Sequence, residues 1–275
     1  MKKKINHKKI LVFYNSSKYS DKKDLIAFLK NYKRYKPGIK HKLIVCFKNL
    51  EKKEILKRKK ILKKVKYIPF IDPEMSNDFE WGSQKRVSEL YKNYFIMFLN
   101  DYSYPICDDW LKIFSNYITK KSLIASMGSL SSHANNSLYR KKDETYSISF
   151  FFKIIYYFIN FNIFPNPNIR TTGYMYHSKV YLDFFKNKTV TDKKLSHYYE
   201  SGKNSFSKFF IKKKFPIFIV NSDNKKFDLM NGKKSKTFAS DQQQKLIISD
   251  KRTRSYSKLN KSQKRMVTKQ TWGEI

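Results

Sequence analysis

The chain has 275 residues, of which 40% are hydrophobic and 17% aromatic, and its formal net charge is +37 at pH 7. This length suits one generous α/β domain, or a domain with a subdomain, and the apolar content excludes wholesale disorder. Seven glycines and seven prolines exclude collagen-like and low-complexity chains. Two distant cysteines, Cys46 and Cys107, argue against a disulfide scaffold and a four-ligand zinc site.

The positive charge is concentrated near the N-terminus. Residues 1–70 hold 24 lysines and arginines against four acids, a net charge of +20, and residues 52–64 alone hold eight. Such a surface attracts nucleic acid, anionic lipid or phosphorylated small molecules. Lys, Asn, Ile, Tyr and Phe are all abundant, so an AT-rich genome would equally explain much of the lysine excess. The N-terminus has no secretory signal pattern, so we expect a cytoplasmic protein.

Strand and helix patterns alternate through the first half. Short apolar runs predict buried strands at 10–14, 42–47, 65–71, 94–99 and 123–127. Helical spacing predicts helices at 24–35, 52–64 and 109–118, with another ending over 87–92. This alternation predicts an α/β fold with a mostly parallel sheet flanked by helices, whose ligands bind at the carboxyl ends of the strands. The loops to watch are therefore 15–20, 72–82 and 100–105.

The second half is less regular. Residues 148–164 form the most apolar stretch, but they number 17 and include a lysine and two asparagines, so we expect a core or interface-lying helix. Further patterns predict a strand at 170–177, a helix from 180, a helix at 193–214 and a strand at 216–220. Residues 221–275 are polar with few apolar anchors. We therefore expect a domain over 1–220 and a C-terminal extension over 221–275, packed on the domain or partly mobile.

One segment carries a chemical signal, the run FIMFLNDYSYPICDDW at 95–110. An apolar strand that ends in Asn-Asp-Tyr-Ser and leads to Trp-Leu resembles the GT-A-fold glycosyltransferases, family 2 in particular. In that family the strand runs into Leu-Asp-x-Asp, and the carboxylates hold a divalent metal against the donor's diphosphate. Charge compensation is needed there because the diphosphate is the leaving group.

This chain departs from the family pattern at the metal position. Asn100 and Tyr102 occupy the two aspartate places, and only Asp101 between them is acidic. Two arrangements stay open: a divalent metal, Mg²⁺ or Mn²⁺, bound through Asp101, or lysine and arginine side chains that meet the diphosphate directly. A third interpretation is that LNDYS is merely a strand-ending turn.

Other blocks resemble a group of bacterial family 2-like enzymes associated with polysaccharide synthesis. The resemblance implies that Phe13, Tyr14, Asn15 and Ser16 contact the nucleotide and that Asp78 lies next to the donor ribose and sugar. It covers nearly the whole chain through short blocks, which read LVFYNSS, NDFEWG, FPNPNIRTTGYMYHS, HYYESGKNSFSK and SDQQQKLIISDKRTRSY.

The same resemblance places Glu200 where inverting family 2 enzymes carry the acid that deprotonates the acceptor hydroxyl. We expect Glu200 at a helix start, where the helix dipole favours an ionised carboxylate; a plain helix-capping role is the alternative. His197 is a weaker candidate for contact with the acceptor or a phosphate, the alternative being an ordinary core or surface histidine. Arg170 either binds phosphate or acceptor or pairs with an acid.

The function that follows is sugar transfer from a nucleoside diphosphate sugar to an acceptor hydroxyl, with inversion, in cell-envelope polysaccharide or glycolipid synthesis. The acceptor would be a glycan or a lipid-linked glycan, and the enzyme would lie in the cytoplasm or at the inner face of the cell membrane. The alternatives are a degenerate GT-A-like protein that binds a sugar nucleotide, and a basic nucleic-acid-binding protein. Against the last, no RNP-like aromatic motif, helix-turn-helix or zinc finger is found, so no nucleic acid is expected.

Overall fold

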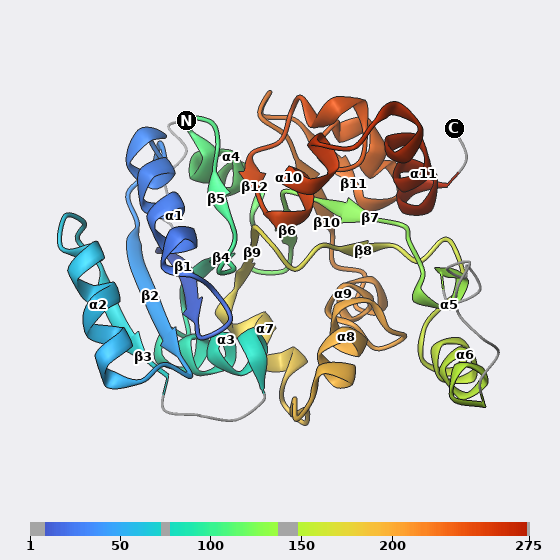
Figure 1. The fold of residues 1–275 in the computed structure, drawn as a ribbon, viewed down its shortest axis with the longest axis horizontal. Helices are drawn as coiled ribbons and strands as arrows, with labels where there is room; N and C mark the ends of the chain where they lie inside the picture. Colours follow the sequence, from blue (N-terminus) through green and yellow to red (C-terminus); the bar gives the residue numbers. More distant parts are fainter. Residues whose placement is uncertain (1–8, 73–77, 137–147, 274–275) are drawn as a thin grey trace, which may run out of the picture.

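The structure is a computed structural model that describes residues 9–72, 78–136 and 148–273. Its centre is an eight-stranded sheet in the order β11-β10-β6-β9-β4-β1-β2-β3 (Figure 1). The strands are β1 Ile10–Ser17, β2 Lys42–Lys48, β3 Ile68–Ile71, β4 Phe95–Leu99, β6 Leu123–Ala125, β9 Tyr174–His177, β10 Ile217–Val220 and β11 Lys226–Asp228.

The pairing within the sheet is mostly parallel. Strands β3, β2, β1 and β4 run parallel to one another, and β10 runs parallel to β6. Strand β9 is antiparallel to both β4 and β6, and β11 is antiparallel to β10. The predicted α/β class with a mostly parallel sheet is confirmed.

Helices cover both faces of the sheet, because alternate residues of each buried strand point to opposite sides. One apolar cluster joins α1, α2 and α4 to the residues of β1 that include Val12. The other joins α3, α7, α8 and α9 to the β1 residues that include Phe13. The helices are α1 Lys22–Arg34, α2 Lys52–Leu62, α3 Phe79–Leu90, α4 Trp110–Tyr117, α5 His133–Asn136, α6 Ile148–Asn160, α7 Ser178–Phe184, α8 Lys193–Ser201, α9 Phe206–Lys212, α10 Lys251–Ser257 and α11 Lys261–Trp272.

Two predicted elements differ in the structure. The single helix expected over 193–214 is two helices, α8 and α9, because the chain turns at Gly202 and Ser205 caps the second one. A Cβ on Gly202 would lie 2.6 Å from the Tyr198 carbonyl oxygen, so glycine is needed at this turn. In the polar stretch expected to be a loop over 73–82, residues from Phe79 onward form the first turn of α3.

The segment after residue 220 packs against the rest of the chain. Strand β11 forms one edge of the large sheet, and β12 (Ile248–Ser249) pairs with β5 (Tyr104–Pro105). The Trp272 indole is buried and donates a 2.8 Å hydrogen bond to the Phe238 carbonyl. A further pair, β7 (Gly128–Ser129) with β8 (Asn168–Ile169), brings the 166–172 segment beside the sheet. Among the described residues no helix is long and apolar enough to cross a membrane.

Candidate functional site

The site is built where β1 and β4 end side by side. These strands are parallel and in register from Ile10 with Phe95 to Tyr14 with Leu99, so the residues after them meet at one edge of the sheet. There the Asn15 amide donates to the Asp101 carboxylate over 2.7 Å. The backbone N–H and hydroxyl of Ser17 donate to the other Asp101 oxygen, the N–H over 3.1 Å.

Both oxygens of the Asp101 carboxylate therefore accept hydrogen bonds from β1, so this side chain is not a free ligand. It is 5% exposed, and burial raises its pKa, although the hydrogen bonds from Ser17 oppose that shift. The Tyr14 hydroxyl also donates to the Asp101 backbone carbonyl over 2.8 Å. This network ties the end of β1 to the loop after β4.

Asn100 extends the network to the next segment. Its amide nitrogen donates to the Thr172 hydroxyl over 2.7 Å, and the neighbouring Thr171 hydroxyl donates to the Glu200 carboxylate over 3.3 Å. Three blocks that are far apart in sequence thus meet through two hydrogen bonds, one to each of two adjacent threonines. These bonds link Asn100 and Glu200 to neighbouring residues of one segment.

Glu200 lies in the last turn of α8, so the expectation that it stands at a helix start was wrong. The C-terminal end of a helix carries partial negative charge and disfavours a carboxylate. Burial raises the Glu200 pKa, opposed by the charges of His197 and Arg170 and by the Thr171 hydrogen bond. A raised pKa brings this carboxyl closer to what a general base needs near neutral pH.

Glu80 is a second carboxyl that the sequence analysis did not single out. It follows Phe79 in the first turn of α3 and lines the same pocket as Asn15, Asn100 and Asp101. Burial raises the Glu80 pKa to about 8, with further contributions from the charges of Glu200 and, more weakly, Asp101. At neutral pH this carboxyl is therefore mostly protonated and can donate a hydrogen bond.

Asp78 belongs to a buried network of four charges. It accepts from Lys48 over 2.5 Å and from Arg86 over 2.7 Å, and the same two cations bind Asp72 over 3.1 and 2.8 Å. Burial alone would raise the Asp72 pKa, but the Arg86, Ser83 and Lys48 contacts outweigh it and the pKa falls. Asp78 does not line the pocket; the acid of its block that does is Glu80.

The other residues expected at the nucleotide are buried. Phe13 is in the core against Phe98, with ring centroids 5.7 Å apart. The Tyr14 ring stacks on Phe28 at 3.9 Å. The Ser16 hydroxyl is fully buried and accepts a 2.6 Å hydrogen bond from Arg58. Of the four, only Asn15 lines the pocket.

The charges of His197 and Arg170 both lower the pKa of Glu200. The Arg170 guanidinium lies 4.4 Å from the Phe238 ring centroid and 3.9 Å from an Asp250 carboxylate oxygen. Burial lowers the Arg170 pKa, opposed by Asp250, and its Nε is buried without a hydrogen-bond partner. The His197 ring stacks on His133 at 6.0 Å.

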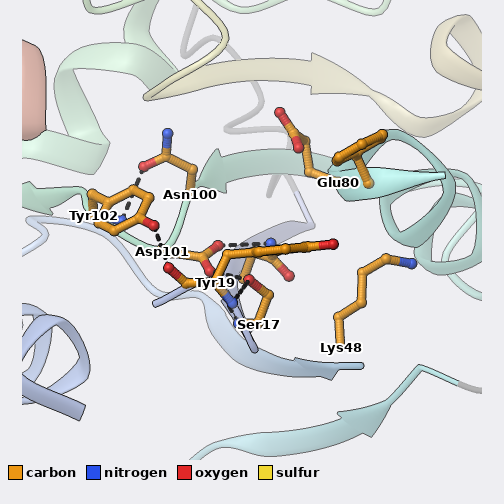
Figure 2. Close-up of a pocket in the computed structure, with 9 residues that line it drawn as sticks. Ser17, Tyr19, Lys48, Glu80, Asn100, Asp101 and Tyr102 are labelled. Atoms are coloured by element: carbon orange, nitrogen blue, oxygen red, sulfur yellow. Dashed lines mark hydrogen bonds between the residues drawn. The ribbon is translucent and has the colours of Figure 1, made fainter. Parts of the chain in front are cut away.

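The pocket at the sheet edge has a volume of about 170 Å³. Figure 2 shows Asn100 and Tyr102 on one side and Lys48 on the other, with the Tyr19 ring between them. The Tyr102 hydroxyl donates to the Tyr19 carbonyl over 2.5 Å, so one wall of the pocket is closed by two tyrosines. The lining residues are Asn15, Ser17, Tyr19, Lys48, Phe79, Glu80, Asn100, Asp101 and Tyr102.

Cations from α10 reach the rim of this pocket. Arg254 donates to the Tyr102 carbonyl over 3.0 Å, and its guanidinium lies 4.9 Å from the Tyr104 ring centroid. The Lys251 ammonium lies 5.5 Å from the Tyr102 ring centroid. Arg252, exposed on the same turn, contributes to the pKa shifts of Glu200 and Arg170. The C-terminal block thus places positive charge over both the pocket and Glu200.

The residues at the Asp101 position do not fit a bound divalent metal. Both Asp101 oxygens accept hydrogen bonds, and the Asn100 carbonyl oxygen accepts from the Tyr102 N–H over 3.2 Å. Over residues 9–72, 78–136 and 148–273, no group of three or more His, Cys, Asp or Glu side chains could hold a metal ion. Hard divalent cations prefer several free oxygen ligands, and this set offers few.

Sequence reasoning missed Glu80, Lys48 and Arg254. The sequence did contain an indication for Glu80, because this residue follows Asp78 by two positions in the block expected beside the donor sugar. Arg254 lies in the SDKRTRSY block, whose similarity was recognised without assigning a role to its cations. Lys48 follows a predicted strand beside the predicted site, but only the tertiary fold shows that it pairs with two buried acids.

The chain was compared with known proteins. No protein-family model and no curated protein sequence matches it. Similar solved structures include a 4-diphosphocytidyl-2C-methyl-D-erythritol synthase from Anaerococcus prevotii, at 14% identity and TM-score 0.45, covering 81% of this chain and 93% of that one. Mouse xyloside xylosyltransferase 1 matches at 9% identity and TM-score 0.44, with coverages of 78% and 85%. The bifunctional glycosyltransferase WbbM matches at 10% sequence identity and a TM-score of 0.42. The match covers 77% of this chain but only 38% of WbbM.

Proposed function

We propose that this protein is a glycosyltransferase that moves a sugar from a nucleoside diphosphate sugar to an acceptor hydroxyl. The observation that carries the proposal is the convergence of Asn15, Asn100 and Asp101, Thr171 and Thr172, and Glu200 at one edge of the sheet, through the hydrogen bonds described above. These residues come from the separate blocks that resemble family 2 enzymes. A group of residues that is dispersed in sequence and joined in space is typical of an active site on a parallel sheet.

The pocket between Asn15 and Tyr102 would hold the nucleotide. The exposed Tyr19 ring offers a surface on which the base could stack. The side-chain amide oxygen of Asn15 has no hydrogen-bond partner among the described residues and offers an acceptor. Arg254 and Lys251 at the rim would meet the diphosphate charge directly, because the Asp101 donor set does not fit a metal. The chain's own cations would thereby stabilise the departing diphosphate.

Glu200 would take the proton from the acceptor hydroxyl, and direct displacement would invert the sugar carbon. Glu80 is a poorer base, because with a pKa of about 8 it is mostly protonated at pH 7. The charge of Glu200 contributes to that shift, so an ionised Glu200 favours the protonated form of Glu80. A role in cell-envelope polysaccharide or glycolipid synthesis is part of the proposal and rests on the resemblance.

Thermal shift with a panel of nucleoside diphosphates tests the donor site, with and without Mn²⁺ and in EDTA. We expect at least one nucleoside diphosphate to raise Tm in EDTA, and Arg254→Gln to reduce that shift. Arg34→Gln is the matched control, since its guanidinium also lies over a tyrosine ring, 5.2 Å from the Tyr35 centroid, on α1. Loss of all binding in EDTA would contradict the cation role.

Transfer is tested with the sugar nucleotide of the base so identified, by following release of the nucleoside diphosphate with a panel of glycan acceptors. Donor binding with neither transfer nor hydrolysis would instead identify a sugar-nucleotide-binding protein with a degenerate site. Failure of every nucleoside diphosphate to bind, with RNA retained at high salt, would support the nucleic-acid-binding alternative.

A further inference from the structure

Helix α6 presents an apolar face that the described part of the chain leaves uncovered. Phe151 and Phe152 are each 65% exposed and Ile159 is 62% exposed. Ile155 and Phe158 are also exposed, so the residues recur at the spacing of one side of a helix. Exposed clusters of large apolar side chains mark interaction sites. In Figure 1 α6 lies at the opposite end of the molecule from α2 and β3.

The opposite side of α6 is anchored to the protein. The Tyr157 ring stacks on His133 at 5.6 Å, and Phe161 is buried with its ring 5.1 Å from the same histidine. The backbone N–H of Lys203 donates to the Asn160 carbonyl over 2.9 Å, which ties the end of α6 to the turn after α8. The helix is therefore held in place with Phe151, Phe152 and Phe158 facing outward.

Lysines lie on and beside α6. Lys153 is exposed within α6 itself. The Lys203 ammonium donates to the Phe158 carbonyl over 3.2 Å, and the Lys194 ammonium lies 5.9 Å from the Tyr156 ring centroid. Amphipathic helices with aromatic and aliphatic residues on one side and lysines beside them lie in the interface of anionic bilayers.

We propose that α6 docks the protein on the surface of an anionic lipid bilayer, with Phe151, Phe152 and Ile159 entering the headgroup region. Charge complementarity selects this occupant. A second copy of the chain would bring its own lysines and its net charge of +37 against the first, whereas anionic headgroups attract both. The inference does not depend on the proposed function. If that function holds, docking also keeps Glu200 near the membrane, because His197 on the same helix stacks on His133.

Co-sedimentation of the full chain with vesicles tests the proposal. We expect binding to vesicles of phosphatidylcholine mixed with phosphatidylglycerol, weaker binding as NaCl rises, and little binding to phosphatidylcholine alone. The double variant Phe151→Asp with Ile159→Asp should lower the affinity at least about 10-fold. Its matched control is Leu90→Asp with Met266→Asp, which changes two residues of similar exposure, 67% and 57%, elsewhere on the surface.

A set of charge-reversal variants tests the three lysines on and beside α6. The triple variant Lys153→Glu, Lys194→Glu and Lys203→Glu should also lose at least about 10-fold in affinity. The control reverses Lys23, Lys30 and Lys33, three exposed lysines of α1, and so changes the net charge equally. Equal losses in both sets, or equal binding to neutral and anionic vesicles, would overturn the proposal. So would a dimer in light scattering that Phe151→Asp with Ile159→Asp dissociates, if vesicle binding is absent.

Discussion

The Asn15 side-chain amide donates a 2.7 Å hydrogen bond to the Asp101 carboxylate and so joins the ends of two parallel strands that are 86 residues apart in sequence. Both residues are nearly buried, at 5% exposure each. The bond uses one oxygen of the only acid in the LNDYS segment, and Ser17 uses the other. The position that resembles a metal-binding motif is therefore a polar contact between the end of β1 and the loop after β4.

Loss of the hydrogen bonds to the Asp101 carboxylate should lower both the stability of the protein and its affinity for nucleoside diphosphate. Asp101→Ala leaves the buried donors of Asn15 and Ser17 without an acceptor, which costs about 1–3 kcal/mol in the free energy of unfolding. Urea denaturation measures this loss, and the thermal shift by nucleoside diphosphate should shrink as well. Asp228→Ala is the control, because the exposed Asp228 side chain forms no capping bond to the helical turn it precedes. Unchanged stability in Asp101→Ala would mean that these hydrogen bonds are not formed in solution.

Glu200→Gln should lower the rate of sugar transfer at least about 100-fold, the lower end of general-base effects, because an amide cannot accept the acceptor's proton. The donor's thermal shift should stay near that of the wild type, since the pocket lining does not include Glu200. The matched control is Glu89→Gln, an exposed glutamate near the end of α3. Near-wild-type transfer by Glu200→Gln would remove this residue from the mechanism.

The raised pKa of Glu80 predicts that the protein loses stability as the pH rises from 5 to 9. Its pKa in the folded protein is about 8, above the ordinary value of 4.5, so the protonated form favours folding. Its contribution is complete below about pH 4.5 and is lost as the pH rises through about 8. Relative to Glu80→Gln, which mimics the protonated form, the wild type should lose on the order of 2 kcal/mol between pH 5 and pH 9, after allowance for solvent screening.

Urea denaturation of both proteins at pH 5, 7 and 9 measures this difference. The same comparison with Glu89→Gln should show no such trend, because Glu89 is exposed. A constant difference between the wild type and Glu80→Gln over this range would contradict the burial of the Glu80 carboxyl.

Lys48 should be more important for stability than for chemistry. Its side chain is 3% exposed and its ammonium pairs with Asp72 and Asp78. Lys48→Ala therefore removes one of the two cations that pair with both acids in the described part of the chain, and Arg86 remains. Loss of one partner from a buried ion pair costs about 3–5 kcal/mol. The control Lys213→Ala breaks an exposed pair with Asp183, at 42% and 47% exposure, and should cost less than about 1 kcal/mol. Equal effects in denaturation would refute the burial of the Lys48 network.

Local sequence patterns predicted most strands of the large sheet and most of the helices. Short apolar runs such as residues 42–47 can be stable only when both faces are buried, which favours strands of a parallel sheet between helices. The sequence also marked the edge at which Asn15 and Asn100 meet, because parallel strands end on the same side. These features follow from local patterns and from rules of chain connection, so no coordinates were needed to expect them.

Which side chains reach the site depends on how the strands and helices pack together. Phe13 and Asn15 differ by two residues on one strand, yet one is in the core and the other lines the pocket, because the strand passes from between the helices to the edge of the sheet. Glu80 rather than Asp78 faces the pocket, because Lys48 and Arg86 hold Asp78. The exposed apolar side of α6 likewise could not be read from the sequence. Composition shows how much apolar surface a chain has, but packing decides which part of it other elements cover.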